Sequence, residues 1–164
     1  MKNHAIYPGS FDPVTYGHLD LVRRAAALFD RLVIAVGHNP SKRPLFTAEE
    51  RVAMIRAETS DLPNVEVDVF QGLAVDFARA RGLNVVLRGL RTVSDFESEY
   101  AMALTNRSFA PEIESVFVMP GERWSYTSSR LIKEIVTVGG SVDNFVPPRV
   151  AKALRERLGP ESRP

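Results

Sequence analysis

Short apolar runs alternate along the chain with longer segments whose apolar residues recur at three- and four-residue steps. Five of the runs predict β-strands, at residues 4–7, 31–37, 64–70, 84–87 and 114–119. Several are rich in valine and isoleucine, which is typical of parallel strands that are buried on both faces. Strands that alternate with helical segments indicate βα units. We therefore predict an α/β fold with one five-stranded parallel sheet, doubly wound and Rossmann-like.

The segments between and after the runs predict amphipathic helices. Four of them carry an apolar face, formed by Leu19, Val22, Ala26 and Phe29, by Val93, Phe96, Tyr100 and Ala103, by Leu131, Ile135 and Val138, and by Val150, Leu154 and Leu158. Thr47 with Glu50, and Ser94 with Glu97, have the spacing of capping boxes that begin a helix. No repeat or long linker interrupts the pattern, so we expect a single domain over residues 1–164.

Composition narrows the functional classes. A chain of 164 residues without cysteine buries about 70% of its unfolded surface and needs no disulfides. The lack of cysteine excludes thiolate metal sites and a cysteine nucleophile, and it favours a reducing cytosol. No stretch approaches the ~20 apolar residues of a membrane span. The net charge of +1 provides no general field for nucleic acid. We expect a soluble, cytoplasmic protein with no membrane and no nucleic-acid partner.

The loop after the first predicted strand has the features of an anion site. Residues 7–18 read YPGSFDPVTYGH, and in an open parallel sheet ligands bind beyond the carboxyl ends of the strands. Gly9 permits a tight turn and Gly17 a close approach of ligand. His18 falls in the first turn of a helix, where unpaired N–H groups favour phosphate. A histidine at this position also serves as a plain cap, and spacing alone does not separate the two roles.

Residues 7–18, which end in Thr-Tyr-Gly-His, resemble the signature of the nucleotidylyltransferase superfamily. Five later segments resemble, in order and spacing, the bacterial phosphopantetheine adenylyltransferase family. They are Asn39-Pro40-Ser41-Lys42, Phe46-Thr47-Ala48-Glu49-Glu50-Arg51, Arg88-Gly89-Leu90-Arg91, Asp95-Phe96-Glu97-Ser98-Glu99 and Trp124-Ser125-Tyr126-Thr127-Ser128-Ser129. The resemblance extends from about Ala5 to the last predicted helix.

The resemblance implies an enzyme that transfers AMP from ATP to 4'-phosphopantetheine, giving dephospho-coenzyme A and pyrophosphate in coenzyme A biosynthesis. The acceptor phosphate is already a nucleophile, so direct in-line displacement needs no covalent intermediate. The family also implies Mg²⁺ carried by the nucleotide phosphates, feedback by coenzyme A and a homohexamer. No histidine and carboxylate spacing predicts a metal site in the protein itself. The apolar face around Phe96 and Tyr100 could form part of a subunit interface, and packing in the core explains it equally well.

The resemblance assigns site residues by position. The catalytic residues are His18, Lys42 and Arg91. The ATP-binding residues are Ser10, Phe11, His18, Gly89, Leu90, Arg91, Glu99, Trp124, Ser125, Tyr126, Thr127, Ser128, Ser129 and Arg130. The acceptor-binding residues are Ser10, Lys42, Ala74 and Arg88. No residue is assigned to a metal.

Each assignment has a plainer structural alternative. Lys42 also fits an exposed lysine, Arg88 and Arg91 fit surface salt bridges, and Glu99 fits a solvated helix face. Ser128-Ser129 is also a common helix cap. Arg130 departs from the family pattern, in which serine or threonine is common. Because a cation in the first turn opposes the helix dipole, we expect its side chain to turn into the crevice toward a ligand phosphate.

Two other functions remain to be weighed. The first is another enzyme of the superfamily, such as a nicotinamide mononucleotide adenylyltransferase or a cytidylyltransferase; the Asn-Pro-Ser-Lys and Arg-Gly-Leu-Arg segments argue against it. The second is a nucleotide- or coenzyme A-binding sensor that has the fold without turnover. A sensor has no need of a group that acts on the transition state, so the presence of His18, Lys42 and Arg91 together favours the enzyme.

Overall fold

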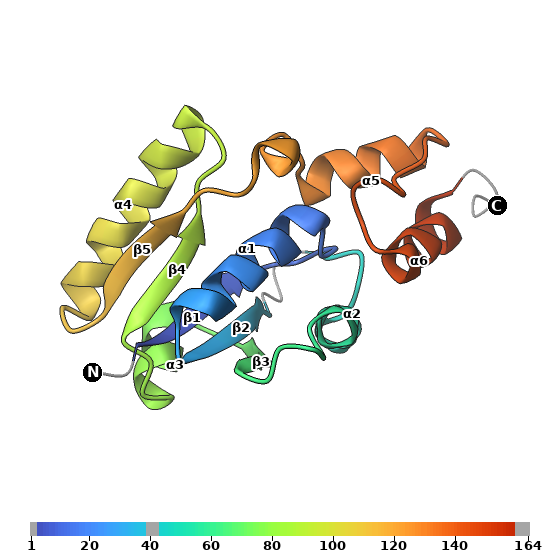
Figure 1. Cartoon of the computed structure of the whole chain (residues 1–164). Helices are drawn as coiled ribbons and strands as arrows, with labels where there is room; N and C mark the ends of the chain where they lie inside the picture. Colours follow the sequence, from blue (N-terminus) through green and yellow to red (C-terminus); the bar gives the residue numbers. More distant parts are fainter. Residues whose placement is uncertain (1–2, 39–42, 160–164) are drawn as a thin grey trace.

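The computed structural model describes residues 3–38 and 43–159 (Figure 1). Five parallel strands form one sheet in the order β3-β2-β1-β4-β5. Their bounds are β1 His4–Gly9, β2 Arg31–Gly37, β3 Val65–Phe70, β4 Val85–Gly89 and β5 Glu114–Val118. Each lies within two residues of its prediction, and the predicted α/β fold class is confirmed.

Helices connect the strands and extend the chain beyond the sheet (Figure 1). Their bounds are α1 Tyr16–Leu28, α2 Ala48–Glu58, α3 Ala74–Ala80, α4 Val93–Phe109, α5 Ser129–Thr137 and α6 Pro148–Leu158, with a 3₁₀ turn η1 at Glu122–Trp124. The capping box predicted for α2 is present, with the Thr47 hydroxyl accepting from the Glu50 N–H and the Glu50 carboxylate accepting from the Thr47 N–H.

Successive residues of the buried strands point into two separate cores. Ala5 and Tyr7 of β1 join a core that includes residues of α1, α2, α5 and α6. Ile6 lies between them in the sequence and joins a second core with Val75 and Ala78 of α3. Because side chains alternate across a strand, the two clusters lie on opposite faces of the sheet, as a doubly wound fold requires.

The strand order places a topological switch point between β1 and β4. The connection through α1 leads from β1 to β2 on one side, and the connection through α3 returns the chain from β3 to β4 on the other side. The loops that leave the carboxyl ends of β1 and β4 therefore diverge and open a crevice, which is where open α/β sheets bind ligands.

The apolar faces predicted for two later helices differ from the observed ones. In α4, Val93 is 86% exposed and Phe96 and Tyr100 are about half exposed, so this face does not pack on the sheet. In α5 the buried residues are Ile132 and Val136, while Val138 is 82% exposed. That helix packs against α6 rather than on the sheet, which changes the face it buries.

The start of α4 was also predicted wrongly. Thr92 is the N-cap, and its hydroxyl accepts from the Asp95 N–H at 3.2 Å. Thr92 and Asp95 have the same spacing as the expected pair two residues later, and the earlier pair forms the cap. Within the two described ranges, no helix combines the length and the apolar character needed to cross a membrane.

Candidate active site

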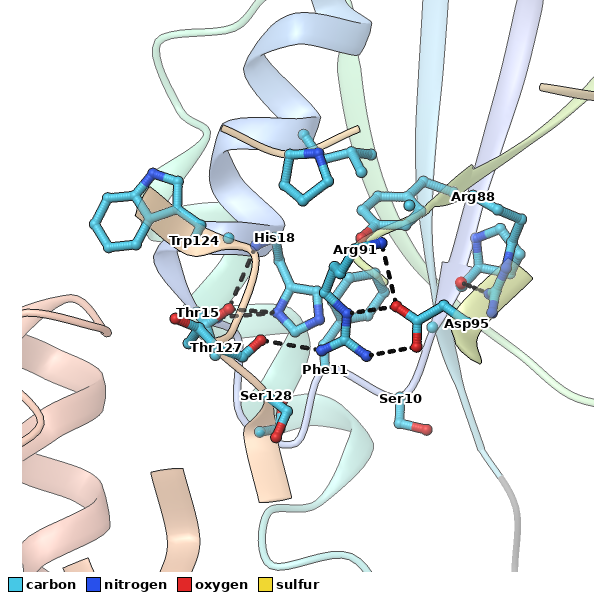
Figure 2. Close-up of a pocket in the computed structure, with 18 of the residues that line it drawn as sticks. Ser10, Phe11, Thr15, His18, Arg88, Arg91, Asp95, Trp124, Thr127 and Ser128 are labelled. Atoms are coloured by element: carbon cyan, nitrogen blue, oxygen red, sulfur yellow. Dashed lines mark hydrogen bonds and ion pairs between the residues drawn. The ribbon is translucent and has the colours of Figure 1, made fainter. Parts of the chain in front are cut away.

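A cavity of about 290 Å³ lies where β1 and β4 end (Figure 2). Its walls come from the loop after β1, the first turn of α1, the end of β4, α4, and the segment that leads into α5. An adjoining cavity of about 330 Å³ shares Ser10, His18 and Ser129 with the first, and adds Arg51 and Lys133. The crevice therefore brings together three segments that the sequence predicted to bind one ligand.

His18 faces this crevice from the third position of α1. Its Nδ1 lies 3.1 Å from the backbone nitrogen of Thr15, the N-cap residue, and 3.0 Å from the Thr15 hydroxyl. Burial, aided by the positive charge of Arg91, lowers the pKa of His18 to about 4. The imidazole is therefore neutral at physiological pH and acts as a hydrogen-bonding group rather than as a cation.

The ring of Phe11 packs against the imidazole. Its centroid lies 5.1 Å from that of His18 and 5.2 Å from that of Tyr7, both in edge-to-face geometry. Phe11 has a φ of 48°, a left-handed conformation that is uncommon for a bulky side chain. A Cβ on Gly9 would lie 2.9 Å from the Phe11 ring, so glycine at this position makes room for the ring.

Each of the two predicted phosphate-binding arginines is held by a carboxylate. Arg88 donates from Nε and Nη2 to Glu99, and from Nη1 to the Pro8 carbonyl oxygen. Arg91 donates from Nε and Nη2 to Asp95, and from Nη1 to the Thr127 carbonyl oxygen. Burial opposes ionisation of Asp95, but the hydrogen bond and charge of Arg91 outweigh it and lower the pKa of Asp95.

Three hydrogen bonds occupy three of the five N–H groups of each guanidinium. The remaining two on each have no hydrogen-bond partner within residues 3–38 and 43–159, which leaves them to a ligand. Both arginines form salt bridges, as the structural alternative predicted, and both also line the cavity, so the salt bridges do not exclude a role in binding.

The start of α5 forms the opposite wall. The Ser128 hydroxyl accepts from the Leu131 N–H, and Ser129 Oγ donates to the Pro13 carbonyl oxygen at 2.7 Å. Thr127 is only 4% exposed, and its hydroxyl has no hydrogen-bond partner among the residues that the structure describes. A buried hydroxyl without a partner costs free energy. The residue that carries it lines the cavity beside a helix N-terminus, where an anion would be favoured.

Several predicted site residues lie elsewhere. Tyr126 is 62% exposed and packs on Phe145, and neither it nor Ala74 lines the cavity. Ser125 and Leu90 line an apolar depression beside α4 that adjoins the main cavity at Arg91, whereas Trp124 and Gly89 line the main cavity itself. Lys42 falls outside the described residues.

The expectation that Arg130 turns into the crevice is wrong. Its side chain is 89% exposed and pairs with Glu134, one helical turn further along α5. The carboxylate of Glu134, four residues further along α5, offers the guanidinium a partner on the outer face of the helix. This ion pair compensates for the unfavourable position of a cation in the first turn.

The sequence analysis missed residues that hold the site together. Arg51 is 2% exposed, and its guanidinium donates to four carbonyl oxygens, those of Ser10, Gly37, Phe46 and Thr47. Asp12 is 7% exposed and accepts from two backbone N–H groups and from Lys133. Both fix the loop after β1. No spacing signalled these roles, because the contacts that fix the loop join residues 33 or more positions apart for Asp12 and 41 positions apart for Arg51 and Ser10.

Comparison with known proteins agrees with the site. Residues 6–135 match the model of the cytidylyltransferase-like family, to which the chain belongs. Within it the chain belongs to the phosphopantetheine adenylyltransferase family, because relatives of that name are more than half identical over almost its whole length. One from Anaeromyxobacter dehalogenans (strain 2CP-C) is 55% identical over 97% of both chains. One from Caldanaerobacter subterraneus subsp. tengcongensis is 51% identical over 94% of this chain and 96% of its own.

The fold also matches a solved structure. A Vibrio parahaemolyticus protein assigned as a nicotinate-nucleotide adenylyltransferase superposes with a TM-score of 0.68 over 97% of this chain and 99% of its own, at 17% identity. At that identity the likeness concerns the fold alone. It agrees with the Rossmann-like arrangement predicted from the sequence.

Proposed function

We propose that the protein transfers the adenylyl group of ATP to 4'-phosphopantetheine, giving dephospho-coenzyme A and pyrophosphate. The observation that carries this proposal is the crevice at the switch point, where His18, the two arginines and the start of α5 converge. Relatives that bear the name of this activity align over almost the whole chain at more than half identity, which supports the choice of acceptor.

The chemistry needs positioning and charge stabilisation more than an activated nucleophile. An oxygen of the acceptor phosphate bonds to the α-phosphorus of ATP while the bond to the β-phosphate oxygen breaks, and pyrophosphate leaves with that electron pair. Because the phosphate is already anionic at neutral pH, no base is required. Donors that stabilise the pentacoordinate phosphorus then supply most of the rate.

The residues have distinct roles in this proposal. His18 donates to an oxygen of the transferred phosphate, and Arg91 holds the ATP phosphates together with Ser128 and Ser129. Arg88 holds the acceptor phosphate. Thr127 lines the same cavity, and its backbone carbonyl accepts from Arg91, which helps to hold that guanidinium.

The remaining roles rest on the resemblance alone. Lys42 contacts the phosphates, Ser10 and Phe11 contact ATP, and Glu99 contacts the nucleoside. Glu99 does so while paired with Arg88, so its second effect is to hold that guanidinium in place.

In the proposed reaction Mg²⁺ is bound by the phosphates of ATP rather than by side chains of the protein. Among the described residues no group of three histidine, cysteine or acidic side chains is placed to hold a metal ion. The two carboxylates that line the cavity, Asp95 and Glu99, are both engaged by arginines. A Mg²⁺ ion bridging the phosphates of ATP would neutralise charge as the reaction proceeds.

We further propose that the chain forms a homohexamer through the exposed apolar side of α4. Phe96 and Tyr100 stack with centroids 5.7 Å apart while both remain about half exposed. Next to them Val93 and Met119 are largely exposed and line an apolar depression of about 650 Å³. Exposed apolar patches of this kind mark interaction surfaces. Sedimentation of the wild type and of Phe96→Glu tests the assembly, because a single mass for both would remove this face from the interface.

We also propose that coenzyme A regulates the protein and that the protein acts in the cytoplasm. Coenzyme A differs from the product dephospho-coenzyme A by one phosphate, so it is expected to compete for the same crevice and to act as a feedback ligand. The absence of cysteine and the use of ATP favour a cytoplasmic location.

A single assay tests the activity. Purified protein is incubated with ATP, Mg²⁺ and, in parallel, 4'-phosphopantetheine or nicotinamide mononucleotide, and pyrophosphate release is measured. We expect release with 4'-phosphopantetheine and its reversal when dephospho-coenzyme A and pyrophosphate are supplied. Faster release with nicotinamide mononucleotide would overturn the proposal, and binding of ATP without release would indicate a sensor.

A further inference from the structure

The first turn of α1 carries a capping box in which histidine takes the place usually held by glutamate or glutamine. The Thr15 hydroxyl accepts from the His18 N–H at 3.4 Å, and the Thr15 N–H donates back to Nδ1 of the imidazole at 3.1 Å. In the usual box the returning acceptor is a carboxylate or amide oxygen. Here it is a ring nitrogen, so the helix cap and the active-site histidine share one set of hydrogen bonds.

This geometry determines which ring nitrogen carries the proton. A backbone N–H can only donate, so Nδ1 must present its lone pair to Thr15. The Thr15 hydroxyl, 3.0 Å from the same atom, is able to donate to it as well. A neutral imidazole has one proton, which is therefore on Nε2. That edge of the ring is turned away from Thr15 and faces the crevice (Figure 2).

The plane of the ring is fixed independently of Thr15. Phe11 packs against the imidazole at an interplanar angle of 68°, and Phe11 is itself only 3% exposed. A 180° rotation of the ring about the Cβ–Cγ bond, which would put Cδ2 in the place of Nδ1 and Cε1 in the place of Nε2, is opposed by Phe11 and by the loss of both contacts to Thr15. The hydrogen bonds thus set the tautomer, and the aromatic contact keeps the orientation.

We propose that Thr15 is a positioning residue that holds His18 as the Nε2–H tautomer, so that the ring presents a neutral hydrogen-bond donor to a phosphate oxygen. The role of the donor rests on the proposed function, whereas the tautomer does not. The opposite tautomer would turn a lone pair toward phosphate oxygens and repel them. Burial and the positive charge of Arg91 lower the pKa of His18 to about 4, so the ring is neutral and carries a single proton.

The tautomer is measured directly by ¹⁵N NMR of the imidazole in the ligand-free wild type, with the His18 signal assigned by its absence from His18→Gln. We expect a protonated Nε2 and an unprotonated Nδ1 near pH 7. A proton on Nδ1, or an equal mixture of the two tautomers, would overturn the proposal whether or not the protein transfers adenylyl groups. Absence of adenylyl transfer with the proton on Nε2 would instead refute only the proposed function.

A second experiment separates positioning from helix capping. Thr15→Val keeps the shape of the side chain but removes the hydroxyl, and Thr15→Ser restores it. Thr47→Val is the matched control, because Thr47 caps α2 with the same kind of box and lines neither cavity of the site. Each variant is checked by thermal unfolding before kinetics.

We expect Thr15→Val to lower kcat about three- to tenfold, as the loss of a hydrogen bond that acts mainly in the transition state should, with little change in the KM for ATP. In its NMR spectrum the Nε2–H form should remain dominant, because the Thr15 N–H still donates to Nδ1, and a minor Nδ1-protonated form should appear because the hydroxyl contact is lost. Thr15→Ser should recover both properties, and Thr47→Val should lose stability with an unchanged kcat. A Thr15→Val protein with wild-type kcat and tautomer, or a Thr47→Val protein with the same loss of kcat, would reduce Thr15 to a simple cap.

Discussion

The two walls of the crevice hold their functional groups by different means. On the α1 side, His18 is neutral and is fixed by Thr15 and by the ring of Phe11. On the β4–α4 side, Arg88 and Arg91 are charged and are fixed by Glu99 and Asp95. Hydrogen bonds to backbone and ring contacts do not depend on salt, whereas ion pairs do.

The difference suggests a division of tasks. In the proposed reaction His18 donates to the transferred phosphate and needs a fixed direction, which a neutral ring tied to a helix cap supplies. The arginines need to meet a charged ligand, and the carboxylates offset their mutual repulsion before that ligand arrives. A ligand phosphate then adds to guanidinium groups that are already oriented.

The largest effect is expected on the α1 side. His18→Ala should lower kcat by on the order of 10²–10³, with a smaller effect on ATP affinity, because a preorganised donor acts chiefly on the transition state. Steady-state kinetics and ATP titration measure the two quantities. His4→Ala, a change at the other end of β1, is the control and should match the wild type. An unchanged kcat in folded His18→Ala protein would remove His18 from the chemistry.

Substitution of either arginine should have a smaller effect than His18→Ala, and the effect should be on ligand affinity rather than on kcat. Arg88→Ala should mainly weaken the acceptor and Arg91→Ala mainly ATP, each by roughly tenfold to a hundredfold, since charge-assisted hydrogen bonds contribute about 1.5–3 kcal/mol. Titration calorimetry with each ligand measures this. Arg79→Ala is the control, because Arg79 pairs with Asp76 and Glu112 on the outer surface. Wild-type affinities in both variants would leave the two residues with structural roles only.

The pH dependence of stability distinguishes the neutral wall from the charged one. The pKa of His18 is about 4 in the folded chain and 6.5 for an unperturbed imidazole, so between these pH values the unfolded chain binds a proton that the folded chain does not. The free energy of unfolding should therefore fall as pH falls from 6.5 to 4, by on the order of 2 kcal/mol from this group, and the contribution should be complete above pH 6.5.

Urea unfolding of the wild type and of His18→Gln across this range isolates the contribution. Glutamine is able to accept the Thr15 N–H as in an ordinary capping box, but it does not titrate. Other acidic groups change protonation in both proteins alike. If the free energies of unfolding of the two proteins changed with pH in parallel, His18 would not be held neutral by the fold.

The smallest effect is expected from Arg130→Ser. Because its side chain is 89% exposed and paired with Glu134, ATP affinity should change less than about twofold, at low as well as at moderate salt. Isothermal titration at two salt concentrations is sufficient. A several-fold loss at low salt that shrinks as salt is added would instead mean that Arg130 swings toward the nucleotide when it binds.

The hydrophobic pattern predicted the elements that pack on the sheet and failed for those that do not. The strands β1, β2 and β4 and the face of α1 with Leu19 and Val22 are largely buried as expected, whereas the edge strands β3 and β5 are only partly buried. Periodicity could not predict the exposure of Phe96 and Tyr100, because an apolar stripe on α4 is the same for a core and for an interface.

The site was predictable where its residues form local patterns. Thr15 and His18 stand three residues apart, a spacing that is recognisable as a capping box once histidine is counted as an acceptor. Asp95 follows Arg91 by four residues, a common ion-pair spacing. Arg51 gave no such signal, since it contacts carbonyl groups at residues 10 and 37 that only the folded sheet brings within reach.

The pairing of β1 with β4 has a consequence for folding. Ala5 lies beside Val85 in the sheet, and the crevice also needs Ser129 at the start of α5, so no short fragment of the chain contains the site. A nucleotide that binds only the folded crevice therefore stabilises the whole sheet against unfolding. A ligand at a hundred times its Kd should raise the free energy of unfolding by about 2.7 kcal/mol, and the protein's melting temperature becomes a gauge of how full its crevice is.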